Sequence, residues 1–387
     1  MSTRLLVTDG ANKNTLAVLR ALGREHRIDV VSHQPRGLTL ASYSRFCGRT
    51  IRVRTAASDL DAYAAELLGM LAGDKYAALI PVGLQSCLAV SRRKADFEKL
   101  TGVAIADWEP MQVAYDRDRA MRLAASTGVP IPRTYRLTDA GSLDAINAYP
   151  VVLKANHPRG DLVRYCNDRR EIEWHYAEVV KQGGTGAIAQ EYVRGFGCGF
   201  YGIYDHGTLA AHFMHRRIKE FPITGGPSAV AESCFDGRLF EYGRRLCDAL
   251  RWHGPIMAEF KYDSLAGDYR LIEINPKLWG SLDLTIEAGV NVPGMLLELA
   301  QGKRVKSTGS YSYLKYRWVF PGELKVLLCD RSFSNLKSFF APGRDVRTNI
   351  WMSDPCPTAF QMVNGLAQGG LAMVSARRRY PHGKIRA

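Results

Sequence analysis

The chain has 387 residues, of which 46% are hydrophobic and 23% charged, a composition typical of globular proteins. Its net charge of +14 favours anionic partners such as nucleotides, acidic metabolites, nucleic acid or an anionic surface. No apolar run reaches about 18 residues and no secretory signal opens the chain, so we expect a cytoplasmic protein without a membrane span. The eight cysteines include no C-x-x-C pair, which argues against a zinc knuckle and a disulfide framework.

The first hundred residues predict a small parallel sheet covered by helices. Strand-like apolar runs at 4–8, 28–32 and 77–82 alternate with helical spacing at 14–22 and 63–71. Strands that alternate with helices in this way indicate parallel pairing. The turn after the first run lacks G-x-G-x-x-G, which disfavours a dinucleotide-binding site. The carboxyl ends of these strands still form a crevice that can hold part of a substrate.

Further along the chain the pattern changes to short β runs. A helix is expected at 115–126, and His206-Gly207 and Gly267-Asp268 are turn signals that predict two hairpins. The expected strands are 151–155, 187–193, 199–205, 208–215, 255–263 and 269–275, with a helix at 240–252. We therefore divide the chain into 1–110, 111–195, 196–305 and 306–387.

Three side chains of the second hairpin predict a metal site. Glu273 and Asn275 are two residues apart on one strand and so face the same way, and the hairpin brings Glu259 alongside them. Two carboxylates and an amide oxygen are ligands that Mg²⁺ accepts together with nucleotide phosphates. Neighbouring buried carboxylates would repel each other without a cation between them.

The segment around these residues resembles a known signature. Residues 273–281 read EINPKLWGS, which is similar to the E-x-N-P-R motif of the ATP-grasp superfamily, particularly carbamoyl phosphate synthetase, biotin carboxylase and the carboxylate–amine ligases. Glu273 is 14 positions after Glu259, which matches the spacing in carbamoyl phosphate synthetase. Lys277 replaces the usual arginine, so it can meet a phosphate oxygen but cannot form a bidentate fork. The resemblance covers roughly residues 1–300 and ends with Gly289-Val290-Asn291-Val292-Pro293.

The resemblance implies a fold and a nucleotide site. The expected fold is α/β and α+β: an N-terminal parallel-sheet (pre-ATP-grasp) domain at 1–110, a linker helix and small lid subdomain at 111–195, an antiparallel metal-binding subdomain at 196–305, and an extension of unknown role at 306–387. Arg117 is implied to contact ATP phosphate and Lys154 to reach the α- and β-phosphates. The implied adenine hinge is Gln190, Glu191, Tyr192 and Val193.

Two features depart from the family pattern. The lid loop, 156–168, has only Gly160 where relatives have several glycines, so its closure would depend on His157, Arg159 and Arg164. Cys198 falls where the family has a ribose-binding glutamate, which leaves ribose contact in doubt. Nothing nearby in the sequence would lower the pKa of this thiol, so a thiol catalyst is not implied.

A third region is implied to bind the carboxylate that is activated. It begins with His215-Arg216-Arg217 and continues to Thr224-Gly225-Gly226-Pro227-Ser228. Basic side chains bind a carboxylate, and glycines allow backbone amides to approach a developing acyl phosphate. We assign Arg216, Arg217 and Lys277 catalytic roles. Arg217, Gly225, Gly226 and Ser228 are assigned to the substrate.

These assignments predict a ligase that uses ATP and Mg²⁺, with Mn²⁺ as a substitute, to activate a small carboxylate as an acyl phosphate and join it to an amine. Activation of bicarbonate, a non-catalytic nucleotide-binding module and a nucleic-acid binder remain alternatives. The missing partner domain speaks against the first and the complete metal ligands against the second. We expect no specific nucleic-acid partner, and a homodimer remains open.

Overall fold

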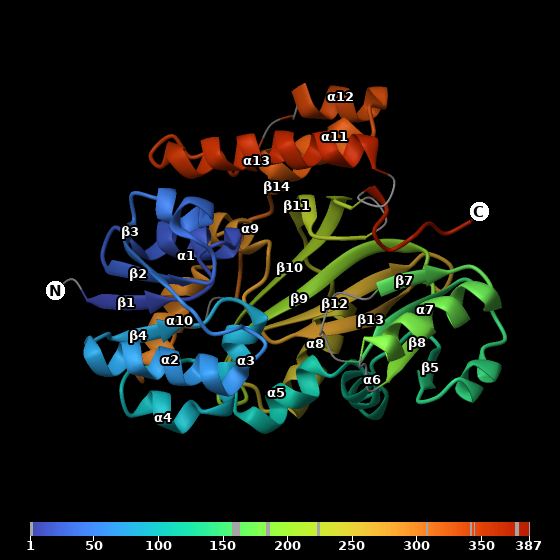
Figure 1. Ribbon diagram of the computed structural model, residues 1–387, viewed down its shortest axis with the longest axis horizontal. Coiled ribbons are helices and arrows are strands. Elements are labelled where there is room, and N and C mark those ends of the chain that lie inside the picture. The colour runs from blue at the N-terminus through green and yellow to red at the C-terminus, as the bar shows by residue number, and fades with distance from the viewer. Residues whose placement is uncertain are drawn as a thin grey trace.

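The computed structural model of the protein describes residues 3–156, 163–182, 186–222, 225–306, 309–340, 343, 345–375 and 379–386. Its frame consists of an N-terminal sheet, a small sheet and a large sheet. Figure 1 shows the N-terminal sheet and the small sheet on opposite sides of the large sheet, with the last helices as a layer at the top of the view. Among the described residues, no helix is long and apolar enough to cross a membrane.

The N-terminal sheet is parallel in every pair, as the alternation of strands and helices predicts. Its strands are β1 (Arg4–Val7), β2 (Arg27–Ser32), β3 (Cys47–Arg52) and β4 (Ala78–Ile80), and its helices are α1 (Lys13–Leu22), α2 (Leu60–Gly73), α3 (Leu84–Arg92) and α4 (Lys94–Glu98), with short helical turns η1 (Arg36–Leu38) and η2 (Leu40–Tyr43). The strand order is β3-β2-β1-β4. Strand β3 is missing from the prediction because its residues, CGRTIR, contain no apolar run.

The small sheet is antiparallel and has a core of its own. Helices α5 (Trp108–Tyr115) and α6 (Arg117–Ser126) lead to it, in place of the single expected helix. Its elements are β5 (Thr134–Leu137), η3 (Gly141–Ala145), β6 (Val151–Ala155), β7 (Val163–Cys166), α7 (Arg169–Lys181) and β8 (Ala187–Glu191). The strand order is β5-β8-β6-β7. Leu153, Ile172 and Val179 belong to a buried cluster formed by this sheet and α7.

The large sheet has seven strands, which are antiparallel except for the last pair. They are β9 (Gly195–Asp205), β10 (Thr208–Glu220), β11 (Ser228–Ser233), β12 (Gly254–Asp263), β13 (Asp268–Asn275), β14 (Lys315–Arg317) and β15 (Val346–Thr348), accompanied by α8 (Gly237–Ala249), α9 (Leu282–Glu287) and α10 (Val292–Ala300). Their order is β13-β12-β9-β10-β11-β14-β15. Both predicted hairpins, β9-β10 and β12-β13, are confirmed.

The last part of the chain completes the large sheet and adds a helical layer. Strands β14 and β15 extend the sheet edge, and η4 (Val319–Glu323), α11 (Leu324–Cys329), α12 (Phe333–Phe340) and α13 (Pro355–Val374) follow or flank them. Just before α13, Asp354 pairs with Arg20 of α1 at 3.1 Å, and both side chains are 2% exposed. The helical layer is therefore anchored to the N-terminal part of the molecule.

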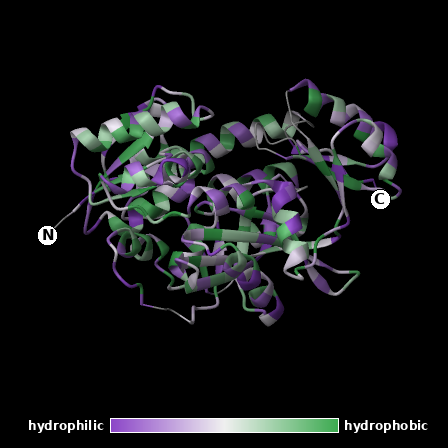
Figure 2. Ribbon diagram, turned by 90° about the horizontal axis from the view of Figure 1, so that it is seen from below, coloured by the Kyte–Doolittle hydropathy of each residue, from purple (hydrophilic) through white to green (hydrophobic). Residues whose placement is uncertain are grey.

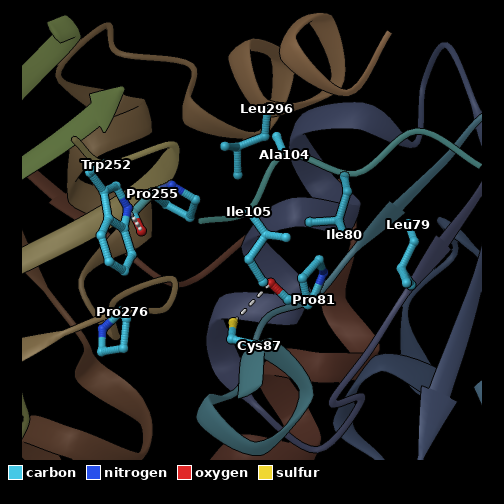
Figure 3. A pocket seen from close by; sticks show the side chains of 10 residues that line it. All are labelled: Leu79, Ile80, Pro81, Cys87, Ala104, Ile105, Trp252, Pro255, Pro276 and Leu296. Carbon is cyan, nitrogen blue, oxygen red and sulfur yellow. Dashed lines mark hydrogen bonds between the residues drawn. The ribbon is translucent and has the colours of Figure 1, made fainter. Parts of the chain in front are cut away.

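The N-terminal sheet and the large sheet share their hydrophobic cores. One buried cluster joins Leu6 and Tyr63 to Phe200, and a second joins Val18 to Trp279. Figure 3 shows a cavity at this junction, lined by apolar side chains from both parts. It has a volume of about 10 Å³, room for roughly one water molecule. In Figure 2 hydrophilic and hydrophobic stretches alternate along most ribbons, as expected for elements with one buried and one exposed face.

Candidate functional site

The acidic side chains of β12 and β13 meet as the hairpin predicts. Glu259 and Glu273 are direct cross-strand partners, and their side chains are 17% and 29% exposed. The register shifts immediately after this pair, so the hairpin is irregular at the site. The Asn275 amide donates a hydrogen bond of 2.8 Å to a Glu273 oxygen. All three residues proposed as metal ligands therefore lie together on one hairpin.

Each carboxylate has an arginine beside it. Arg217 of β10 lies 2.8 Å from a Glu259 oxygen and 2.9 Å from a Glu220 oxygen. Arg117, the first residue of α6, lies 3.7 Å from a Glu273 oxygen and donates a 2.6 Å hydrogen bond to the Ala155 carbonyl. The helix start and the strand thus bring one positive charge to each side of the acidic pair.

The two glutamates differ in acidity because their neighbours differ. Burial raises the pKa of Glu259; the Arg217 charge opposes this shift and the Glu273 charge adds to it. Burial also acts to raise the pKa of Glu273, but Arg117 and Lys154 outweigh it, and the pKa is lowered. Burial and repulsion from Glu273 both disfavour the ionised form of Glu259, and a cation between the two groups would favour it.

Lys154 of β6 extends toward the hairpin from the small sheet. Its ammonium group donates to the Gln190 side-chain oxygen at 2.7 Å and to the Ile272 carbonyl at 3.3 Å. Pairing of β6 with β8 places Lys154 and Gln190 close together. Burial lowers the pKa of Lys154 to about 8. Two residues proposed to contact the nucleotide are therefore joined to each other.

The remaining hinge residues follow β8 into the large sheet. The Glu191 side chain is exposed, Tyr192 is half-buried and Val193 is buried. The Val193 carbonyl accepts a hydrogen bond of 3.0 Å from Lys261, whose ammonium group also lies 4.9 Å from the centre of the Tyr192 ring. The hinge is thus tied to β12, the strand of Glu259.

The proposed carboxylate-binding region divides into two faces of β10. Arg217 points to the acidic pair, whereas its neighbour Arg216 is half exposed, pairs with Glu232 and lies 6.0 Å from the centre of the Phe196 ring. The structure therefore does not bring Arg216 into the cluster. Adjacent residues of a strand face opposite ways, which explains the separation.

The glycine loop lies between this cluster and the small sheet. The Gly226 carbonyl accepts a 3.3 Å hydrogen bond from Arg217, and Gly225 has a φ of +122°. A Cβ atom at Gly225 would lie 2.9 Å from the Tyr165 hydroxyl of β7, so only glycine fits this approach. Ser228 is buried and begins β11 opposite Glu220. Thr224 lies outside the described residues.

Lys277 is two residues beyond β13. It is half-buried, and its charge helps to lower the pKa of Glu273, although burial acts the other way. Within the described parts of the chain its side chain makes no ion pair or hydrogen bond. A free cation at this position is available for an anionic ligand.

The two departures from the family pattern have different outcomes. Residues 157–162 of the lid loop, which include His157, Arg159 and Gly160, lie outside the described residues. Arg164 donates to the Pro381 carbonyl at 3.3 Å, in the C-terminal tail. Cys198 is buried on β9, where burial raises the pKa of the thiol. It is therefore a core residue rather than a nucleophile.

Sequence reasoning gave no role to Lys13 or Tyr201, and it named His215 only as the start of the carboxylate-binding region. Lys13 lies at the start of α1, after the carboxyl end of β1, with its ammonium group 4.4 Å from the centre of the Trp318 ring. Burial lowers the pKa of Lys13 to about 8, and repulsion from Arg217 contributes. The Nε2 atom of His215 forms hydrogen bonds with the Tyr201 hydroxyl at 2.5 Å and with the Ser281 hydroxyl at 2.7 Å. The sequence signal that could have pointed to Lys13 is its place after β1, because the carboxyl ends of parallel strands form a crevice that can bind a ligand.

Comparison with solved structures identifies the class of fold. The biotin carboxylase domain of 2-oxoglutarate carboxylase from Hydrogenobacter thermophilus, solved with MgADP and bicarbonate, is 18% identical over 81% of this chain and 74% of that chain, with a TM-score of 0.64. L-amino acid ligase from Bacillus licheniformis is 13% identical over 78% and 74%, with a TM-score of 0.61. N5-carboxyaminoimidazole synthetase from Staphylococcus aureus is 12% identical over 86% of each chain, with a TM-score of 0.62. The protein has the ATP-grasp fold.

The sequence comparison is more specific for one part of the chain. Residues 205–319, which contain β10 to β14 and the acidic hairpin, match a family described as ATP-grasp in the biosynthetic pathway with Ter operon. A comparison with curated proteins finds no match. The chain therefore has the fold of the ATP-grasp enzymes, and residues 205–319 match one ATP-grasp family.

Proposed function

We propose that this protein is an ATP- and Mg²⁺-dependent ligase that activates a carboxylate as an acyl phosphate and joins it to an amine. The observation that supports this most directly is the convergence of Glu259, Glu273 and Asn275 in an ATP-grasp fold, with Lys154 and Arg117 beside them. Similar folds occur in an amino acid ligase and in a carboxylase solved with MgADP. The site has both the oxygen donors and the cations that such chemistry needs.

The donor set fits Mg²⁺. Glu259 and Glu273 offer carboxylate oxygens on adjacent strands, and Asn275 offers an amide oxygen once its nitrogen donates to Glu273. Mg²⁺ prefers oxygen ligands and shares them with phosphate oxygens. Bound there, the ion would supply charge neutralisation on the polyphosphate. Arg217 and Arg117 would hold the two carboxylates in place from either side.

The reaction has two displacement steps. A carboxylate oxygen of the substrate attacks the γ-phosphorus of ATP, the bond to the β–γ bridging oxygen breaks, and ADP and an acyl phosphate form. The amine nitrogen then attacks the acyl carbon, phosphate leaves, and the nitrogen gives up a proton to form the amide. Lys154 and Arg117 neutralise charge on the phosphates, while Lys277 is the additional cation near Glu273. No step needs a protein nucleophile.

The test is an assay of ADP and phosphate release with Mg-ATP and a matrix of carboxylates and amines, beginning with pairs of amino acids. We expect release that requires one carboxylate and one amine together, with an amide product of matching mass. Glu273→Gln should reduce the rate by at least about a hundredfold, the usual scale for loss of transition-state charge stabilisation. Arg216→Gln is the matched control, because that side chain faces away from the cluster, and its rate should stay near that of the wild type.

Activation of bicarbonate is the second candidate, because two of the similar folds belong to enzymes of carboxylation. It predicts ADP release that depends on bicarbonate and needs no other carboxylate. A non-catalytic module predicts nucleotide binding without turnover under any combination. Either result would overturn the proposed ligase activity.

A further inference from the structure

Exposed apolar side chains gather in the helical layer near the end of the chain. Phe333 and Phe340 of α12 are 81% and 75% exposed, and Met352, Val363 and Leu366 are 85%, 64% and 51% exposed. Of the large hydrophobic side chains exposed in the described residues, nearly half lie between 333 and 371. Single exposed apolar residues are normal, but here they lie on neighbouring helices, since α12 and α13 both contact α11 and Arg331 reaches Met373. Such a group marks an interaction surface. We call these residues, with Leu336 and Leu371, the α12–α13 face.

Helix α13 has no charged residue anywhere along Pro355–Val374. Its inner side packs on the large-sheet region: a Cβ atom at Gly365 would lie 3.0 Å from Pro321, and Gln361 is buried. Its outer side exposes Met362, Val363 and Leu366. A helix between a core and water normally has a polar outer side. Apart from Gln368, which bonds Lys325 and Asn364, the exposed side chains of α13 are apolar, and this favours contact with a less polar medium than water.

The surrounding sequence is strongly basic. Arg331 and Lys337 at α12 are exposed, and Arg331 reaches the Met373 sulfur at 3.7 Å, which places a positive charge beside the end of α13. Of the two acidic residues in 331–386, Asp354 is buried against Arg20. The charged residues of this stretch are Arg331, Lys337, Arg344, Arg347, Arg377, Arg378, Arg379, Lys384 and Arg386 against Asp345 and Asp354. Of these, Arg347 pairs with Glu287, and Arg386 pairs with Asp168 and Glu171 beside the small sheet.

We propose that the α12–α13 face docks on the surface of an anionic lipid bilayer. Aromatic and aliphatic side chains enter the interface between headgroups and acyl chains, and flanking Lys and Arg residues are attracted to anionic headgroups. A second copy of this chain is a poorer occupant, because it would bring the same positive charges together. Nucleic acid is poorer still, because phosphate contacts need basic side chains across the face, and α13, the longer of its two helices, has none.

The test is co-sedimentation with two kinds of vesicle. We expect binding to phosphatidylcholine vesicles that contain about a third phosphatidylglycerol, and at least about tenfold weaker binding to pure phosphatidylcholine. The variants Phe333→Ser with Phe340→Ser, and Val363→Ser with Leu366→Ser, should each weaken anionic-vesicle binding about tenfold. Leu265→Ser is the matched control, because Leu265 is 84% exposed in the β12–β13 turn. It should leave vesicle binding unchanged.

Thermal unfolding of every variant shows whether the fold is retained, since the substituted side chains are exposed. Equal binding of the α12–α13 variants and the wild type would overturn the proposal, as would an absence of binding to anionic vesicles. Light scattering gives a third outcome: a dimer that the α12–α13 substitutions dissociate, without vesicle binding, would overturn the proposal and assign the face to self-association.

Discussion

At the residue scale, some charged side chains of the candidate site have a partner of opposite charge, and others have only uncharged partners. Glu259 and Glu273 each have an arginine beside them. Lys154 instead donates to the uncharged Gln190 side chain and to the Ile272 carbonyl. Burial consequently lowers its pKa to about 8. The charge of Lys154 therefore changes in a pH range in which the neighbouring arginines stay fully protonated.

Nucleotide binding should make Lys154 take up a proton. A polyphosphate beside the ammonium group favours its charged form, so the pKa of Lys154 rises from about 8 when the ligand binds. We expect MgADP binding at about pH 8.5 to take up a large fraction of a proton and binding at about pH 7 to take up little. Calorimetry in buffers of different ionisation enthalpy measures the uptake. Lys154→Met should abolish it, and the same uptake in that variant would contradict the assignment.

The residues of the site were predictable to different degrees. Strand periodicity alone placed Glu273 and Asn275 on one side, and the hairpin added Glu259. The same periodicity places Arg216 and Arg217 on opposite faces of β10, although the sequence analysis assigned both of them to the site. Lys13 was hidden because its contact with Trp318 joins positions more than 300 residues apart in the chain, and no local pattern reports such a contact.

At the scale of elements, the C-terminal segment is joined to the first helix of the molecule. Asp354 accepts hydrogen bonds from Arg20 at 3.1 Å, from the Ser44 hydroxyl at 2.9 Å and from the Arg45 amide at 3.0 Å. Its carboxylate thus links α1 and η2 to the start of α13. This buried network explains why the long apolar helix has a fixed place.

Removal of that carboxylate should be costly. Asp354→Ala leaves the Arg20 charge buried without its partner, so we expect the free energy of unfolding to fall by about 3–5 kcal/mol. Asp61→Ala is the control, because its pair with Arg92 is exposed at 62% and 44%, and such pairs contribute about 0–1 kcal/mol. Denaturant unfolding of both variants measures the difference. Similar losses in the two would show that the Asp354 network does not anchor α13.

Elements with strong local signals were predictable, and those defined by distant pairing were not. The strand at 151–155 has the expected bounds because its apolar run begins directly after turn residues. Strands β14 and β15 have three residues each, too few for any periodicity. They exist because β11 offers an edge to β14, and β14 in turn offers one to β15. The extension of β10 to Glu220 likewise depends on its partner β11.

At the scale of the whole molecule, the N-terminal and large sheets share their cores, whereas the small sheet has a separate one. The titration of a polar group buried in this shared core is therefore linked to the stability of both sheets. His215 is 1% exposed, and burial lowers its pKa to about 3. The folded protein thus holds a neutral imidazole where the unfolded chain, with a pKa near 6.5, holds a charged one in mild acid.

This difference predicts a loss of stability in acid. Between about pH 6.5 and pH 3 the unfolded chain binds the proton that folded His215 does not, so the free energy of unfolding falls as the pH falls. From pH 8 to pH 5 the contribution of His215 should be about 2 kcal/mol. His215→Gln, which retains a polar group beside Tyr201 and Ser281, should reduce the pH dependence by that amount in denaturant unfolding. An unchanged slope would contradict the account of His215.

The central claim is that Glu259, Glu273 and Asn275 bind a divalent ion together with nucleotide phosphate. Titration calorimetry of ADP with and without Mg²⁺ tests it most directly, because it needs no knowledge of the carboxylate or the amine. We predict binding that is at least about tenfold tighter with Mg²⁺, and loss of this dependence in Glu273→Gln. Nucleotide binding that is indifferent to Mg²⁺ in the wild type, or equally Mg-dependent in Glu273→Gln, would contradict the claim.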